Sequence, residues 1–180
     1  MIIQFCGLSG SGKTTLANRA KNALVKLNVF VEVLDGDEYR QALCADLGFS
    51  REDRNTNVRR LAFVASKLAK HNIVSIICAI NPYDDIRKEV ASKYPGTRTV
   101  FIDCSLEVLL QRDTKGLYKR AMLPDGHPEK LTNLTGVNDP FEVPSLPDLI
   151  IHSSTESVDE STDKIVRFIY QSIVNAPQVL

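Results

Sequence analysis

The 180-residue chain carries 22 basic and 22 acidic side chains, so its formal net charge is zero. Hydrophobic residues make up 43% of it and charged residues 24%, which is typical of globular domains and excludes a disordered chain. A neutral chain lacks the excess of cations on which nonspecific nucleic-acid binding depends, and its longest apolar run, 73–80, is too short to span a bilayer.

Segments with strand and helix patterns alternate along the chain. Short apolar runs predict five strands, at 2–6, 29–34, 73–80, 98–103 and 148–152. Apolar side chains at helical spacing predict helices at 14–27, 39–47, 53–70, 83–93 and 106–120, and a capping box at 157–160 begins a last helix. Because such alternation produces parallel sheets covered on both faces, we expect an α/β fold in one domain spanning residues 1–180.

Residues 122–147 are rich in Pro, Gly, Asn and Asp and predict a long surface loop. A connection of this length is usually functional, so we expect a mobile lid, which together with the end of the preceding helix covers about 112–147.

The four cysteines are spaced too widely for the common zinc patterns. Cys6, Cys78 and Cys104 lie in or beside apolar strands, and Cys44 does not. We expect the thiols of these three to be buried, and the N-terminus has no signal-peptide pattern. Both features favour a cytoplasmic protein.

The first strand leads into Gly7-Leu-Ser-Gly-Ser-Gly12-Lys13-Thr14, which satisfies the P-loop pattern G-x-x-x-x-G-K-[ST]. Its backbone N–H groups suit phosphate oxygens, its lysine the β and γ phosphates of ATP, and the hydroxyl of Thr14 a Mg²⁺ ion. The pattern predicts a three-layer P-loop NTPase fold. The residues expected to bind ATP are Gly7, Ser9, Gly10, Ser11, Gly12, Lys13, Thr14 and Thr15.

Two carboxylates, Asp35 and Asp37, follow the second strand. Side chains at the carboxyl edge of a parallel sheet face the ligand crevice. We therefore expect Asp35 to join Thr14 at the Mg²⁺ ion and Asp37 to orient or deprotonate an attacking hydroxyl. The alternative is a turn in which both act as local acceptors.

A dense run of charge follows at 46–60, with several arginines and Phe49. Arginine suits phosphate or sulfate, and an aromatic ring suits stacking on a base. The alternative is a solvated helix face with Phe49 as a core anchor.

Four blocks of sequence, in order, resemble the adenylylsulfate (APS) kinase family. They are Asp35-Gly-Asp37-x-x-Arg40, the run from Asp46 to Arg60, Arg112-Asp113-Thr-Lys115-Gly-Leu-Tyr118-Lys-Arg-Ala121, and Thr135-Gly-Val-Asn-Asp139-Pro-Phe-Glu142-x-Pro144. The resemblance runs from residue 1 to about 170.

The resemblance implies a Mg²⁺-dependent enzyme that transfers the γ-phosphoryl group of ATP directly to the ribose 3′-hydroxyl of APS, giving 3′-phosphoadenylylsulfate (PAPS) and ADP. It also implies a possible homodimer. Lys13, Asp37 and Arg54 would be catalytic, and Arg112 would contact ATP. The positions implied for the acceptor site are Asp37, Arg40, Phe49, Arg54, Asn57, Ile80, Lys115, Gly116, Leu117 and Phe141, with Phe49 and Phe141 on the two faces of the adenine.

Some positions depart from the family pattern. Asn81 stands where a serine is usual that has been described as a phosphorylated intermediate, Glu38 stands where Asn is common, and the lid is longer than usual. These changes concern the acceptor side or the lid. A related kinase for another activated nucleotide therefore remains an alternative, as does a nucleotide-binding module without turnover.

Overall fold

The computed structural model describes residues 1–175, and a sheet of five parallel strands lies at its centre. The strands are β1 (Ile2–Cys6), β2 (Val31–Asp35), β3 (Val74–Cys78), β4 (Arg98–Asp103) and β5 (Leu149–His152). Their order is β2-β3-β1-β4-β5, so β1 is central, with Ile3 paired to Ile76 on one side and Arg98 on the other.

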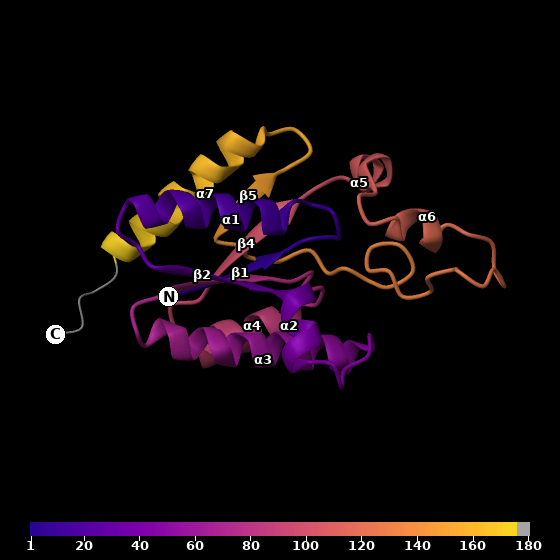
Figure 1. Ribbon diagram of the computed structural model, residues 1–180, viewed down its shortest axis with the longest axis horizontal. Coiled ribbons are helices and arrows are strands. Elements are labelled where there is room, and N and C mark those ends of the chain that lie inside the picture. Colours follow the sequence, from indigo (N-terminus) through magenta and orange to yellow (C-terminus); the bar gives the residue numbers. More distant parts are fainter. Residues whose placement is uncertain (176–180) are drawn as a thin grey trace.

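Helices cover both faces of the sheet (Figure 1). They are α1 (Lys13–Lys26), α2 (Gly36–Leu43), α3 (Arg51–Ala69), α4 (Asp84–Lys93), α5 (Leu106–Arg112), α6 (Leu117–Ala121) and α7 (Val158–Val174). In Figure 1, α1 and α7 lie on one face and α2, α3 and α4 on the other, which is the three-layer arrangement that the sequence predicts. None of the helices within residues 1–175 is long and apolar enough to cross a membrane.

Each face of the sheet has its own apolar core, because alternate residues of a strand point to opposite sides. Ile3 and Ile76 belong to the cluster that contains the buried residues of α1 and α7. Ile2 and Ile77 belong to the cluster with α3 and α4. All residues of β1 and β3 are buried, as expected for strands covered on both faces.

The helix predicted at 106–120 is interrupted, so that prediction was wrong. It ends at Arg112, and α6 begins only after Gly116, whose φ of 64° is a left-handed conformation that glycine adopts without strain. The carboxylate of Asp113 accepts hydrogen bonds from the backbone N–H groups of Tyr118 and Lys119, at 3.0 and 2.8 Å. A side-chain cap therefore starts a second, short helix where apolar spacing alone indicates one continuous helix.

The helices α2 and α3 begin two or three residues earlier than the apolar spacing indicates. Gly36 begins α2 because the carboxylate of Asp35 accepts from the backbone N–H of Asp37 at 2.9 Å. Ser50 and Asp53 form a capping box at the start of α3. The capping box predicted at Ser157 is confirmed.

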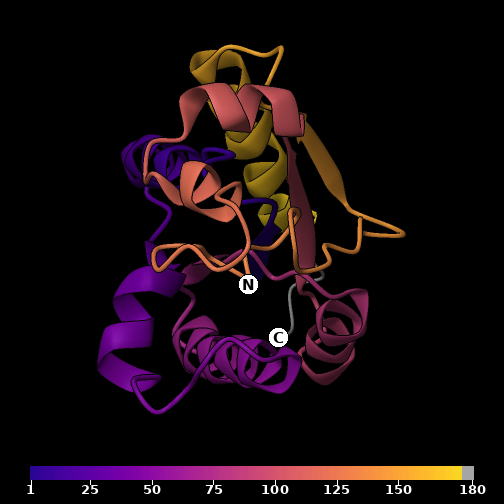
Figure 2. The ribbon, with the colours of Figure 1, turned by 90° about the vertical axis from the view of Figure 1, so that its right-hand side faces the viewer.

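The segment 122–147 contains no helix or strand, only an isolated bridge between Thr135 and Asp139, so the loop prediction is confirmed. In Figure 2, which looks at the molecule from the side that carries α5 and α6, the segment crosses between the two helical layers. A third apolar cluster joins it to the rest of the chain through Leu134, Leu109 and Tyr118, with Leu8 of the P-loop against them. This segment, which the sequence predicts to be a lid, therefore packs directly on the P-loop.

The cysteines are all buried free thiols, as the sequence predicts for Cys6, Cys78 and Cys104; Cys44, for which it made no prediction, is buried as well. Burial raises the pKa of Cys6 and of Cys78 to about 12, so both are protonated at neutral pH.

Candidate active site

A cavity of about 300 Å³ opens beside the P-loop and the residues that follow β2 and β3. Most of the predicted site residues line it: Ser9, Gly10, Gly12, Lys13, Thr14, Thr15, Asp35, Asp37, Arg40, Phe49, Arg54, Asn57, Ile80 and Lys115. Segments far apart in the sequence thus meet where the parallel sheet places its ligand crevice.

The P-loop holds the side chain of Lys13 inside the cavity wall. Gly12, at a φ of 97°, caps α1 in a conformation that favours glycine, and Lys13 follows as the first helical residue. The ammonium of Lys13 donates to the carbonyl oxygens of Gly7 and Leu8 at 2.9 and 2.7 Å. Burial lowers the pKa of Lys13 to about 8. In the ligand-free enzyme the ammonium therefore donates to neutral carbonyl oxygens. Anionic phosphate oxygens of a bound nucleotide would be stronger acceptors.

Thr14 and Asp35 meet at the base of the cavity. The Thr14 hydroxyl donates to Asp35 Oδ2 at 2.7 Å, so the two predicted metal ligands lie together. A hydroxyl and a carboxylate are hard oxygen donors, and Mg²⁺ typically binds one or two such protein groups beside substrate phosphates. The donor set fits Mg²⁺.

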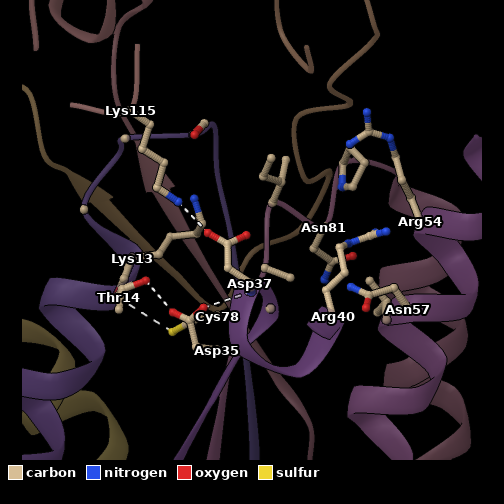
Figure 3. A pocket seen from close by; sticks show the side chains of 18 of the residues that line it. Lys13, Thr14, Asp35, Asp37, Arg40, Arg54, Asn57, Cys78, Asn81 and Lys115 are labelled. Carbon is tan, nitrogen blue, oxygen red and sulfur yellow. Dashed lines mark hydrogen bonds and ion pairs between the residues drawn. The ribbon is translucent and has the colours of Figure 1, made fainter. Parts of the chain in front are cut away.

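Asp37 lies in the middle of the cavity, paired with Lys115 from the start of the lid (Figure 3). Both side chains are more than half exposed, at 75% for Asp37 and 53% for Lys115. Such an exposed ion pair is weak, so a ligand can replace either partner.

Arginines and an aromatic ring form the opposite wall of the cavity. The guanidinium of Arg40 lies 4.6 Å from the centre of the Phe49 ring, and that of Arg54 lies 5.6 Å from it. The Phe49 side chain is 53% exposed rather than buried, which argues against its alternative role as a core anchor. A half-exposed ring with two guanidinium groups near it suits a flat, anionic ligand.

Two buried amide oxygens also belong to this wall. The Oδ1 atoms of Asn57 and Asn81 are buried without a hydrogen-bond partner among the described residues. Buried polar atoms without a partner are uncommon in folded proteins and are often explained by a water or ligand. In Figure 3, Arg40, Arg54 and Asn57 lie on one side of Asp37, and Lys13 and Thr14 on the other.

A family model described as adenylylsulphate kinase matches residues 1–152. The chain belongs to this family. It is 43% identical over 166 residues to the adenylyl-sulfate kinase of Chloroflexus aurantiacus, covering 92% of this chain and 87% of that protein. Its structure resembles that of the Mycobacterium tuberculosis APS kinase in complex with AMPPNP and APS, with a TM-score of 0.85, 35% identity, and 94% and 96% of the two chains covered.

The resemblance to adenylylsulfate kinases inferred from the motifs is therefore confirmed, and so is the P-loop kinase fold. The enzyme is a kinase of this family. A second curated relative, the adenylyl-sulfate kinase of Deinococcus deserti, is 42% identical over 165 residues, covering 92% of this chain and 88% of that protein.

Some positions predicted from the adenylylsulfate kinase pattern do not line the cavity. Arg112 donates instead to the carbonyl oxygen of Ser153 at 3.0 Å, and Gly116 and Leu117 lie at the start of α6. The ring of Phe141 stacks on Phe101, with 5.9 Å between ring centres. The structure therefore does not bring Phe141 together with Phe49.

Tyr118 contacts the P-loop directly and was not among the predicted site residues. Its buried hydroxyl donates to the carbonyl oxygen of Ser9 at 2.8 Å, and burial raises its pKa to about 12. The sequence signal for it was its place in the block from Arg112 to Ala121. Apolar spacing predicts its burial but not the partner of its hydroxyl.

Proposed function

We propose that this enzyme transfers the γ-phosphoryl group of ATP to the ribose 3′-hydroxyl of APS, giving PAPS and ADP. One observation carries the proposal: Asp37 lies between a P-loop and a wall of Arg40, Phe49 and Arg54 within one cavity. A kinase with a nucleotide acceptor needs a loop for the donor phosphates, a wall for the acceptor nucleotide, and a carboxylate between them for the attacking hydroxyl. The complex of the M. tuberculosis relative with both nucleotides supports the same acceptor here.

The chemistry requires alignment and positive charge more than covalent help from the protein. The 3′ oxygen forms a bond to the γ phosphorus as the bond from that phosphorus to the β–γ bridging oxygen breaks. Asp37 accepts the proton of the hydroxyl, and ADP leaves. Lys13 would balance charge on the donor phosphates, and Arg54 would balance charge on the acceptor.

Thr14 and Asp35 would hold Mg²⁺, which when bound neutralises charge on the β and γ phosphates. The protein holds these two ligands close together before the ion binds, and their hydrogen bond of 2.7 Å supports that role.

A direct transfer agrees with the residue after β3. Asn81 is 1% exposed, and its amide nitrogen donates to Gln4 Oε1 at 3.3 Å. An amide cannot form the phosphate ester that a serine can. A phosphoenzyme at this position is therefore excluded.

We further propose that residues 1–180 act as one kinase domain in the cytoplasm, where ATP is available, with residues 112–147 as the lid. The buried free thiols support a reducing compartment. A homodimer is proposed from the family resemblance alone.

The test is release of ADP from MgATP with APS, adenosine monophosphate, other nucleotides or no acceptor, with PAPS identified as the product. We expect rapid release with APS only. The variant Asp37→Asn should lose about 10²- to 10⁴-fold in kcat, the usual contribution of a general base. The matched control is Asp46→Asn, since Asp46 is an exposed carboxylate that pairs with Arg60 outside the cavity.

If ADP is released with another nucleotide but not with APS, that nucleotide is the acceptor and the proposal of APS is wrong. Binding of ATP without turnover on any nucleotide would indicate a nucleotide-binding module instead.

A further inference from the structure

Arg87 of α4 is a buried arginine that does not line the cavity. Its side chain is 2% exposed. Nη1 donates to the carbonyl oxygen of Asn81 at 2.6 Å, and Nη2 donates to the carbonyl oxygen of Glu142 at 2.6 Å and to Asp84 at 3.2 Å. Burying a charge is costly unless its partners compensate, so this arginine strongly favours the conformation that supplies them. It joins the lid to the loop after β3.

Glu142 of the lid forms hydrogen bonds with the same loop and the start of α4 through its backbone and its side chain. Its backbone N–H donates to the carbonyl oxygen of Pro82 at 2.8 Å. Its carboxylate accepts from the backbone N–H of Asp84 at 2.7 Å, in the first turn of α4, and from Arg51 at 3.3 Å. A carboxylate at a helix N-terminus is favoured by the helix dipole as well as by the hydrogen bond.

We call residues 133–142 the strap. Near its beginning the strap contacts Arg54 in the acceptor wall. Nη2 of Arg54 donates to the carbonyl oxygen of Asn133 at 2.7 Å and lies 3.4 Å from the carboxylate of Asp139. The Tyr83 hydroxyl donates to the same carboxylate at 3.4 Å.

These contacts set the direction of Arg54. Its Nε donates to the carbonyl oxygen of Phe49 at 2.9 Å, while Nη2 faces the strap. A guanidinium has five N–H donors. Within residues 1–175 the hydrogen bonds of Arg54 come from Nε and Nη2, so both donors of Nη1 are available to an anionic ligand. If the strap moved, Nη2 would lose its partners and the guanidinium would turn.

We propose that Glu142 and Arg87 are positioning residues that fix the strap and thereby orient Arg54 toward the acceptor nucleotide. This inference rests on the proposed function, because it concerns the acceptor side of the same cavity. The hydrogen bonds of Glu142 and Arg87 involve no residue of the P-loop. The strap contacts the P-loop through the apolar packing of Leu134 near Leu8, which these polar contacts do not form. Loosening the strap should therefore weaken binding of the acceptor and spare ATP.

The test is the variant Glu142→Gln, which keeps the size of the side chain and removes its charge. We expect the KM for APS to rise about tenfold, as for a lost charge-assisted contact, and the KM for ATP to stay within about twofold. The matched control is Glu89→Gln. Glu89 forms a similarly exposed pair with Arg59, at 2.8 Å between α4 and α3, and makes no contact with the strap.

A double-mutant cycle tests whether Glu142 acts through Arg54. In an Arg54→Lys background, Glu142→Gln should cost little further affinity for APS, measured by calorimetry on the full chain. The variant Arg87→Lys should shift the same KM as Glu142→Gln, with thermal unfolding confirming that each variant folds.

Equal increases in the KM for ATP and for APS, or additive effects in the cycle, would overturn the inference. A wild-type enzyme that does not act on APS contradicts the proposed function instead. The same comparison is then made with the nucleotide acceptor that the wild type uses.

Discussion

The protonation of a single residue, Lys13, should affect nucleotide binding. Burial lowers its pKa from 10.5 to about 8 in the ligand-free enzyme. Phosphate oxygens favour the charged form, so a bound nucleotide raises that pKa. We expect the Kd of MgATP to rise with pH above about 8, by up to tenfold per pH unit, because binding must then take up a proton.

The measurement is calorimetric titration of MgATP between pH 7 and 9.5. In the control variant Lys13→Arg the guanidinium keeps its proton, so the pH dependence should disappear. A Kd that stays constant over this range in the wild type would show the prediction to be wrong. Folding stability should depend on pH in the opposite direction to ATP binding. Between pH 8 and 10.5 Lys13 is protonated in the unfolded chain and deprotonated in the folded chain, so the free energy of unfolding rises with pH.

Asn81 gives a second prediction, on the variant Asn81→Ser. Asn81 has a φ of 49°, which asparagine tolerates better than serine, and its amide contacts Gln4 in the core. The variant should lose about 1 kcal/mol of the free energy of unfolding, measured in urea, and keep its kcat within a few fold. Mass spectrometry should find no phosphoserine during turnover. A phosphoenzyme that accumulates in this variant and is consumed by APS would show the prediction to be wrong.

At the scale of residues, the sequence predicts the ATP side of the site better than the acceptor side. The P-loop is contiguous, and Asp35 and Asp37 follow a strand whose carboxyl end is recognisable. The position of Phe141 depends on the path of a loop without periodicity. Its partner Phe101 belongs to β4, which no local pattern could indicate.

At the scale of elements, the lid reaches the P-loop through α6. The Tyr118 hydroxyl donates to the carbonyl oxygen of Ser9, a bond of 2.8 Å in a buried position. The variant Tyr118→Phe should raise the Kd of MgATP about fivefold, since a lost hydrogen bond of about 1 kcal/mol loosens the loop that binds phosphate. Affinity for APS should not change.

The matched control is Tyr170→Phe, at a tyrosine of α7 that is 43% exposed. Fluorescence or calorimetric titration of both variants with MgATP checks the difference. Equal affinities in the wild type and in Tyr118→Phe would mean that α6 does not support the P-loop.

Most elements could be predicted from the sequence, because the spacing of apolar residues shows which face of an element is buried, and the period of that spacing differs between strands and helices. β1 and β4 have their predicted ends, and the other strands differ by a few residues. The break between α5 and α6 could not be predicted from spacing. It depends on a capping carboxylate at Asp113 and a left-handed Gly116 inside an otherwise continuous helical pattern.

At the scale of the whole molecule, Asp84 joins α4 to the end of the lid. Its carboxylate contacts Lys88 at 2.7 Å, Ser145 at 2.9 Å and Arg87 at 3.2 Å. Burial alone would raise the pKa of Asp84, but hydrogen bonds from these three partners outweigh it and lower the pKa to about 2. The carboxylate must therefore be ionised to hold the two parts together.

This shift predicts how global stability depends on pH. The folded pKa lies below the unfolded value of 3.8, so the stabilisation is present above about pH 4 and is lost as the pH falls toward 2. Its size is about 2 kcal/mol. The variant Asp84→Asn imitates the protonated state, so it should be less stable than the wild type at pH 6, and the difference should shrink by pH 3. Urea unfolding at both pH values measures it; a difference that is the same at pH 6 and pH 3 would mean that Asp84 contributes by packing alone.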